Sequence, residues 1–284
     1  MFVPDLKLRG LQLCQLEILK EIKKVCQENG IEYILYGGTL LGAIRHKGFI
    51  PWDDDLDIAM LRKDYEKFLK IAPLRLPSYL FIQNNTTDYY PFLMTKIRDS
   101  RTTFIEPLQR EMKVNHGVFV DIMVLDNVPD EPKKRLRLQR QLSIMYKLIH
   151  FGRVKKNTSS YNIFKHALNW VFSTLSIMVP LTKTIKHYND LILQNANHET
   201  AYVGHTTKAV PFKRSYLKKD IMPTSETLFE GELFSVPNSS DSILKKDYGD
   251  YMTLPPEGQQ HPNHAYYYDI SRPYVDYLIN GDNY

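Results

Sequence analysis

The chain has 284 residues, of which 43% are hydrophobic, so it can bury one large core or one core with an attached subdomain. A net charge of +5 excludes a strongly acidic or strongly basic chain, although the charge is unevenly placed. The first residues lead into an amphipathic helix, and we expect no signal peptide. Cys14 and Cys26 lie in that helix, about 18 Å apart and too far for a disulfide, which predicts reduced thiols in a cytoplasmic protein.

The first elements are a helix over 11–29, with Gly30 as its stop, and a strand over 31–36. Gly37 and Gly38 then break the strand, and Thr39 is expected to cap a short helix over 40–45. A turn from a strand through glycines into a helix aims backbone N–H groups and the positive helix end at one point. We therefore expect Gly37, Gly38 and Thr39 to hold a phosphate.

An aspartate-rich stretch, Asp53-Asp54-Asp55-Leu56-Asp57-Ile58, follows the short helix. If 55–60 form a strand, Asp55 and Asp57 share one face of it. Paired carboxylates on one strand face are a good arrangement around Mg²⁺ or Mn²⁺. Asp53 and Asp54 would adjust the metal site without binding the ion themselves. The alternative is an acidic surface turn that binds nothing or Ca²⁺, but no EF-hand spacing follows.

The next elements are a helix over 62–72, ended by Pro73, and strands over 79–83 and 92–98. Lys96 and Arg98 fall on one strand face, where they could reach a diphosphate or simply face solvent. A strand over 117–125 carries Asp121 among apolar residues. That aspartate is either a buried, hydrogen-bonded group or a further active-site carboxylate, and we prefer it to Asp126, which we place in a turn after the strand.

The segment 132–189 contains twelve Lys or Arg residues and no Asp or Glu, so the rest of the chain has 25 basic and 32 acidic residues, a net charge of −7. This asymmetry predicts an anionic partner. Residues 133–156 read as a helix, and 164–181 form the most apolar stretch, with Trp170 and Phe172. Lys165, Pro180 and basic flanks argue against a membrane span and favour an interfacial helix or a buried hairpin. An ordinary basic helical subdomain is the equal alternative.

The last third of the chain returns to mixed structure. It reads as a hairpin about Glu230-Gly231, a helix over 240–248 with Gly249 as its stop, and an aromatic tail.

The order of strand, double glycine, helix and D-x-D is the pattern of the nucleotidyltransferase, or DNA polymerase β-like, fold. Four segments resemble the LicD family, whose relatives are fukutin and fukutin-related protein. They are GGTLLGAIRHKGFIPWDDDLDIAM at 37–60, the K-x-R-D motif at 96–99, FEGELFSVPN at 229–238 and YGDYMTLPP at 248–256. The resemblance implies an α+β fold with a mixed-sheet core and flanking helices. The catalytic domain would comprise 1–131 and 190–284, with 132–189 as a basic helical insert.

The resemblance also implies a reaction: metal-dependent transfer of phosphocholine, or a similar phosphoalcohol, from a CDP-activated donor to a hydroxyl of a cell-surface glycan, with release of CMP. The glycan would be a teichoic acid, lipopolysaccharide or capsule precursor carried on a lipid. The enzyme would work in the cytoplasm, peripheral on the inner face of an anionic membrane that it contacts through 132–189. No nucleic acid is expected as a partner.

We assign the following roles on this sequence. Asp55, Asp57 and Asp121 would bind Mg²⁺ or Mn²⁺. His46 would accept a proton or be only a polar neighbour of the adjacent Arg and Lys. The clamps for the diphosphate would be Arg45, Lys96 and Arg98. A choline headgroup needs an aromatic face, for which we name Trp52 and one of the tyrosines 266–268, chiefly Tyr267.

Three alternatives remain from the sequence. The first is a CDP-glycerol or CDP-ribitol donor. The second is an inactive nucleotidyltransferase-fold binding module at the membrane, which the full acidic set disfavours. The third is an antibiotic nucleotidyltransferase, which the basic insert disfavours.

Overall fold

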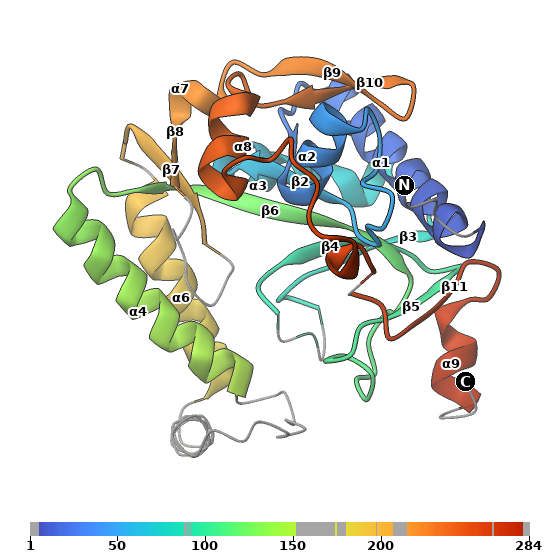
Figure 1. Ribbon diagram of the computed structural model, residues 1–284. Coiled ribbons are helices and arrows are strands. Elements are labelled where there is room, and N and C mark those ends of the chain that lie inside the picture. Colours follow the sequence, from blue (N-terminus) through green and yellow to red (C-terminus); the bar gives the residue numbers. More distant parts are fainter. Residues whose placement is uncertain are drawn as a thin grey trace. The chain divides into compact units, whose positions relative to one another are not determined.

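The computed structural model describes residues 6–87, 90, 92–151, 174, 180–196, 198–206, 215–262 and 264–280 (Figure 1). Helices and strands are mixed along the chain, and the fold is α+β as predicted. The chain divides into two compact units. The first unit comprises Met1–Tyr90, Met94–Met123 and Lys218–Tyr284, and the second comprises Pro91–Leu93 and Val124–Leu217.

The first unit contains a sheet to which β6 (Val118–Val128) contributes its first half. In spatial order its strands are β1 (Ile34–Leu35), β2 (Asp57–Leu61), β6, β4 (Thr95–Asp99) and β3 (Leu80–Gln83). β4 and β6 are antiparallel, with Lys96 opposite Asp121. The Asp121 N–H donates to the Leu56 carbonyl at 2.9 Å, which ties β6 to the acidic stretch.

The strands predicted before residue 126 all differ in extent. β3 begins one residue later than predicted, β4 covers 95–99 rather than 92–98, and β6 covers 118–128 rather than 117–125. β1 has only two residues rather than 31–36, because a helix begins at Gly37. β2 begins at Asp57 rather than Asp55. Asp55 therefore lies just before the strand, and the two carboxylates do not share one strand face.

The helices of the first half of this unit are α1 (Leu6–Asn29), α2 (Gly37–Arg45) and α3 (Arg62–Arg75). Gly30, at φ +56°, ends α1 as predicted. Three predicted boundaries were wrong. α1 begins at Leu6 rather than at residue 11. α2 begins at Gly37, with Tyr36 at its N-cap, so Thr39 does not cap it. α3 continues past Pro73, because a proline in the last turn removes a single intrahelical hydrogen bond.

The chain returns to the first unit after residue 217. It forms α7 (Lys218–Ile221), the hairpin of β9 (Ser225–Phe229) and β10 (Glu232–Val236), α8 (Ser240–Tyr248), η1 (Glu257–Gln259), β11 (Tyr267–Asp269) and α9 (Tyr274–Asn280). The predicted hairpin and the Gly249 stop are confirmed, the latter at φ +68°. β11 pairs with β5 (Thr103–Ile105), and the hairpin packs beside α2 (Figure 1), where the Phe49 and Phe229 rings lie 5.0 Å apart.

The second unit combines the latter half of β6 with β7 (Tyr202–His205) and β8 (Ser215–Leu217) in an antiparallel sheet. Among the described residues, its helices are α4 (Pro132–Phe151) and α6 (Leu181–Ala196). Their shared core includes Leu138 and Leu142 of α4 and Tyr188 of α6. The helix predicted from residue 133 is confirmed over its described part, whereas almost all of the apolar stretch 164–181 lies outside the described residues.

The placement of Asp126 in a turn was wrong. β6 continues through this residue because β7 pairs there, with Asp126 opposite Gly204. The Asp126 carboxylate is buried and accepts a hydrogen bond from the Thr206 hydroxyl within the second unit.

No helix in the described part of the chain combines the length and the apolar character that crossing a membrane requires. Both cysteines have free thiols, as predicted, and burial raises the pKa of each to about 12.

Candidate active site

The glycine turn and the acidic stretch form one piece of structure. The Asp57 Oδ2 atom lies 3.1 Å from the point where a Cβ on Gly37 would stand, and Asp53 Oδ2 lies 2.9 Å from the corresponding point on Gly38. Gly37 also has φ +58°, a conformation that favours glycine. The Asp57 N–H donates to Thr39 Oγ1 at 2.8 Å. The two glycines are therefore required by the carboxylates that pack against the start of α2.

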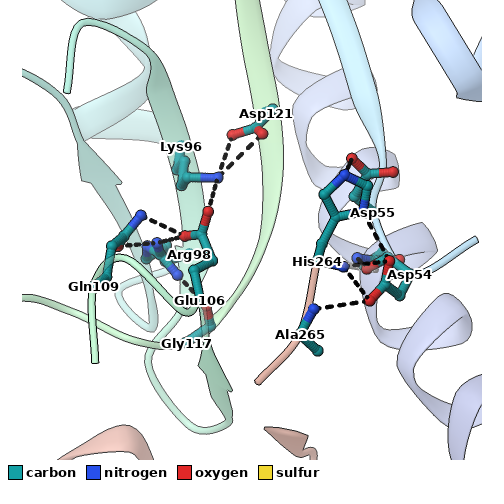
Figure 2. A network of polar contacts seen from close by, with 11 residues as sticks. Asp54, Asp55, Lys96, Arg98, Glu106, Gln109, Gly117, Asp121, His264 and Ala265 are labelled. Atoms are coloured by element: carbon teal, nitrogen blue, oxygen red, sulfur yellow. Dashed lines mark hydrogen bonds and ion pairs between the residues drawn. The ribbon is translucent and has the colours of Figure 1, made fainter. Parts of the chain in front are cut away.

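Asp54 is fully buried and holds the returning chain near residue 264 (Figure 2). Its carboxylate accepts the backbone N–H groups of His264 and Ala265 at 3.0 and 2.9 Å, and its Oδ1 lies 2.8 Å from His264 Nδ1. Burial alone would raise the pKa of Asp54, but the hydrogen bonds from His264 and Ala265 outweigh it and hold the pKa below its ordinary value. Asp54 thus fixes both the segment and the imidazole.

The other ring nitrogen of His264 faces the remaining carboxylates, with Nε2 3.4 Å from Asp55 Oδ2. Asp53, Asp55 and His264 each offer one ligand atom, and these atoms all lie within 4.8 Å of one another. The pKa of His264 is about 9, since Asp54 and Asp55 outweigh the effect of burial. Burial and the Asp55 charge raise the pKa of Asp53 well above its ordinary value. Two crowded carboxylates and an imidazole are a donor set that fits a divalent cation.

Sequence reasoning missed His264 as a site residue. Its partner Asp54 is 210 positions away, so no local spacing links the two. The only signal in the sequence is a pair of histidines, at 261 and 264, in a polar segment before the aromatic tail.

A second network joins the two cations of β4 to acidic groups (Figure 2). The Lys96 Nζ lies 2.9 Å from Asp121 Oδ1 and 3.3 Å from Glu106 Oε1. Arg98 donates to Glu106 Oε2 at 2.8 Å, to the Gly117 carbonyl at 2.8 Å and to a glutamine side chain, that of Gln109, at 3.0 Å. The exposed fractions of the Lys96 and Arg98 side chains are 2% and 0%. Neither cation faces solvent, and each is already paired.

The electrostatics connect Asp121 with the acidic stretch. Burial raises the pKa of Asp121 to about 6, although Lys96 opposes the rise, and the Asp55 charge is among the groups that contribute to it. Burial would also raise the pKa of Glu106, but Lys96 and Arg98 hold it below its ordinary value. Asp121 is therefore a buried, ion-paired group that lies within the field of Asp55.

Three of the other predicted residues lie together at the end of α2. Arg45 donates to the Tyr251 carbonyl at 2.7 Å and to His46 Nε2 at 2.9 Å. Burial and the Arg45 charge lower the pKa of His46, whose ring meets that of Trp52 edge to face at 6.2 Å. Tyr267 is placed differently, in β11, where the Lys7 ammonium lies 5.5 Å from its ring centroid.

Comparison with known proteins gives matches over both short and long stretches. Residues 30–180 match the family model described as LicD/FKTN/FKRP, nucleotidyltransferase domain. The chain is 33% identical over 270 residues to the lipopolysaccharide cholinephosphotransferase LicD of Haemophilus influenzae, covering 91% of this chain and 96% of that protein. It is 42% identical over 55 residues to the ribitol 5-phosphate transferase FKRP of Homo sapiens, covering 18% of this chain and 11% of that protein. His264 lies beyond the residues that the family model matches.

Proposed function

Because the chain belongs to the LicD family and is a LicD-type phosphotransferase, we propose that it transfers phosphocholine from a CDP-activated donor to a hydroxyl of a cell-surface glycan and releases CMP. The observation that carries the proposal is the 33% identity to a lipopolysaccharide cholinephosphotransferase, which extends over 91% of this chain and 96% of the relative. A lipid-linked lipopolysaccharide, teichoic acid or capsule precursor is the proposed acceptor.

The proposed step is a displacement at phosphorus. The acceptor oxygen forms a bond to the phosphorus that carries the alcohol, the bond from that phosphorus to the CMP oxygen breaks, and CMP leaves with the electron pair. We assign the hydroxyl proton to His46. Its Nε2 accepts a hydrogen bond from Arg45, so Nδ1 carries the hydrogen of the neutral ring, and Nε2 is the nitrogen that would take the proton on leaving Arg45. A pKa held below the ordinary value keeps this imidazole neutral and able to accept.

A Mg²⁺ or Mn²⁺ ion fits the acidic cluster by the chemistry of its donors, since Asp53 and Asp55 bring carboxylate oxygens within 4.8 Å of each other and of His264. When bound, the ion neutralises the diphosphate and the charge that develops on the leaving phosphate. Asp57 and Asp121 remain proposed ligands or close neighbours of the ion. The crowding of like charges in this stretch is the physical support for a cation.

The phosphates of the donor are assigned to the start of α2. The backbone N–H groups of Gly37 and Gly38 lie at the positive end of that helix, and Thr39 can donate its hydroxyl proton because its oxygen already accepts from Asp57. Arg98 is enclosed by protein oxygens and would have to give them up to reach a ligand, so we assign it to holding β4 in place. Arg45 is the more accessible of the proposed diphosphate contacts. Lys96 remains the other, and it would have to leave Asp121 and Glu106 to reach a ligand.

The quaternary ammonium of choline is attracted to an aromatic face. Trp52 is the stronger assignment, because it follows α2 closely and meets His46, whereas the Tyr267 ring is near the Lys7 ammonium. A ribitol 5-phosphate donor is the second candidate, favoured by the local match to FKRP. Replacing Trp52 by leucine should reduce the preference for a choline donor over a ribitol donor.

The proposed site of action is the cytoplasmic face of the membrane. The support is the row of exposed cations at the start of α4, which suits a peripheral contact with anionic lipid.

The test is a donor panel with the purified full chain. CDP-choline, CDP-glycerol and CDP-ribitol are each incubated with Mg²⁺, Mn²⁺ or a chelator, and CMP is measured with and without a glycan acceptor. We expect metal-dependent CMP release, fastest from CDP-choline and stimulated by the acceptor. Faster release from CDP-ribitol would select the second candidate. Absence of release from all three donors, or release that a chelator leaves unchanged, would refute the proposal.

A further inference from the structure

The arrangement around His264 is the one that proteins use to orient a metal-binding histidine. Such a histidine donates one ring N–H to a carboxylate, which fixes the tautomer and leaves the lone pair of the other nitrogen for the metal. Here His264 Nδ1 lies 2.8 Å from Asp54 Oδ1, and Asp54 is fully buried. The ring is therefore held with Nε2 directed away from Asp54 and toward Asp55, 3.4 Å from its Oδ2.

We infer that His264 Nε2 is a metal ligand, that it acts with Asp53 and Asp55, and that Asp54 is the positioning residue that orients it. The inference rests on the proposed metal-dependent function and adds a nitrogen donor to it. The three ligand atoms lie within 4.8 Å of one another, a spacing that one ion can bridge with bonds of about 2.0–2.3 Å after small side-chain adjustments.

The contacts of Asp54 separate this role from simple anchoring of the segment. The backbone N–H groups of His264 and Ala265 already bind the Asp54 carboxylate, so the segment is held without the imidazole. The ring adds a third contact to Asp54 and brings Nε2 to 3.4 Å from Asp55 Oδ2.

A nitrogen ligand also changes which ion binds best. An all-oxygen site suits Mg²⁺, whereas imidazole shifts preference toward Mn²⁺ and later transition metals. We therefore expect Mn²⁺ to bind the full chain more tightly than Mg²⁺, and we expect His264→Gln to reduce this preference.

The test is pulsed electron paramagnetic resonance of the full chain loaded with Mn²⁺, which detects a directly bound nitrogen by its ¹⁴N modulation. The wild type should show the modulation, and His264→Gln should lose it. Asp54→Asn, which weakens the orienting contact, should lower Mn²⁺ affinity by about 10- to 100-fold, the range usual for such partners. His261→Gln is the matched control, since His261 is an exposed histidine of the same segment, and it should keep both modulation and affinity.

The outcomes distinguish this inference from the proposed function. Mn²⁺ binding by the wild type without ¹⁴N modulation would overturn the histidine ligand and leave the metal-dependent reaction standing. Failure of the wild type to bind Mn²⁺ would overturn both. Modulation that survives in His264→Gln, or that disappears in His261→Gln, would also overturn the assignment. The wild-type spectrum decides the matter even where a variant fails to fold.

Discussion

Single carboxylates in the acidic stretch have different surroundings, and amide substitutions can separate their roles. Asp57→Asn changes the charge and hardly the shape, and the backbone N–H that bonds Thr39 is retained. We expect the circular dichroism and the urea midpoint to stay near wild type while metal-dependent CMP release falls by about 100-fold or more, as when one preorganised electrostatic contact is lost. Near wild-type turnover by Asp57→Asn would remove this residue from the proposed ligand set.

Asp121→Asn should behave differently, because the Asp121 carboxylate is the close partner of a buried lysine. The Lys96 side chain is 2% exposed. In the variant, the acidic partner of the Lys96 ammonium in this network is Glu106, because the amide carries no charge. Glu106 still neutralises Lys96, and burial already disfavours the charge of Asp121, so we expect a loss of only about 1 kcal/mol in the free energy of unfolding, together with loss of activity. Urea unfolding measures the first effect. A loss of several kcal/mol would show that Glu106 does not compensate Lys96.

At the scale of elements, the start of α2 sets the position of an acidic side chain. A Cβ on Gly38 would stand 2.9 Å from Asp53 Oδ2, the mobile end of a side chain, so Gly38→Ala should displace Asp53 and leave the helix folded. We expect Mn²⁺ affinity to fall by about tenfold, with little change in stability because alanine favours a helix. Gly258→Ala is the control, since no atom lies within 4 Å of its added Cβ, and it should bind Mn²⁺ as the wild type does.

The exposed cations of α4 form the surface with which we expect the chain to meet a membrane. They are Lys133, Lys134, Arg137 and Arg140. At about 1 kcal/mol each near an anionic bilayer, four cations would hold the protein reversibly. The chain should co-sediment with phosphatidylserine vesicles at low salt and dissociate as salt is raised. Replacing all four by glutamine should weaken co-sedimentation and spare CMP release from a soluble acceptor.

Arg135 belongs to the same basic run but is left out of that variant. Its Nε donates to the Pro129 carbonyl at 2.9 Å, and its guanidinium lies 4.2 Å from the Tyr202 ring centroid, so its replacement would disturb the second unit itself. Wild-type protein that stays in the supernatant at low salt would show that α4 has another role.

For the whole molecule, the sequence predicted what depends on neighbouring residues. The double glycine before the acidic run, the hairpin at Glu230-Gly231 and the glycine stops of α1 and α8 all follow from local conformation, and the structure confirms these elements. Contacts between distant segments were not predictable in the same way. Examples are the glutamate that neutralises Lys96 and Arg98, the extension of β6 by β7, and the bonds from Asp54 to residue 264.

The candidate site likewise has features that the sequence predicted and contacts that it could not predict. Period-2 alternation placed Lys96 and Arg98 on one face of β4, but it could not show that Glu106 would enclose them. It also placed Asp121 on a strand beside the acidic stretch, where the Asp121 N–H bonds Leu56. The face on which a residue lies follows from the sequence pattern, whereas its burial depends on which later segment covers that face.

Stability of the whole molecule should respond to acid through a buried histidine. Burial lowers the pKa of His116 to about 4, and its Nε2 lies 2.8 Å from the Met112 carbonyl. Between about pH 6.5 and pH 4 the His116 imidazole binds a proton in the unfolded chain but not in the folded chain. The free energy of unfolding therefore falls as the pH falls through this window. The full effect is on the order of 3 kcal/mol and is complete below about pH 4.

Urea unfolding at a series of pH values measures this slope. His116→Asn has no titrating ring, so its stability should depend less on pH between 6.5 and 4. His261→Asn, at an exposed histidine, should keep the wild-type slope. Equal slopes for wild type and His116→Asn would show that other groups carry the acid response.

The separation of 210 positions between Asp54 and His264 has a consequence for biosynthesis. A ribosome makes the glycine turn and the acidic run early, then the whole of the second unit, and only afterwards the segment that binds Asp54. Until that segment emerges, the acidic run lacks its imidazole and the N–H donors that hold it. Under the proposed ligand assignment, a nascent chain lacks the third metal ligand until residue 264 has left the ribosome, and we expect metal-dependent activity only after that point.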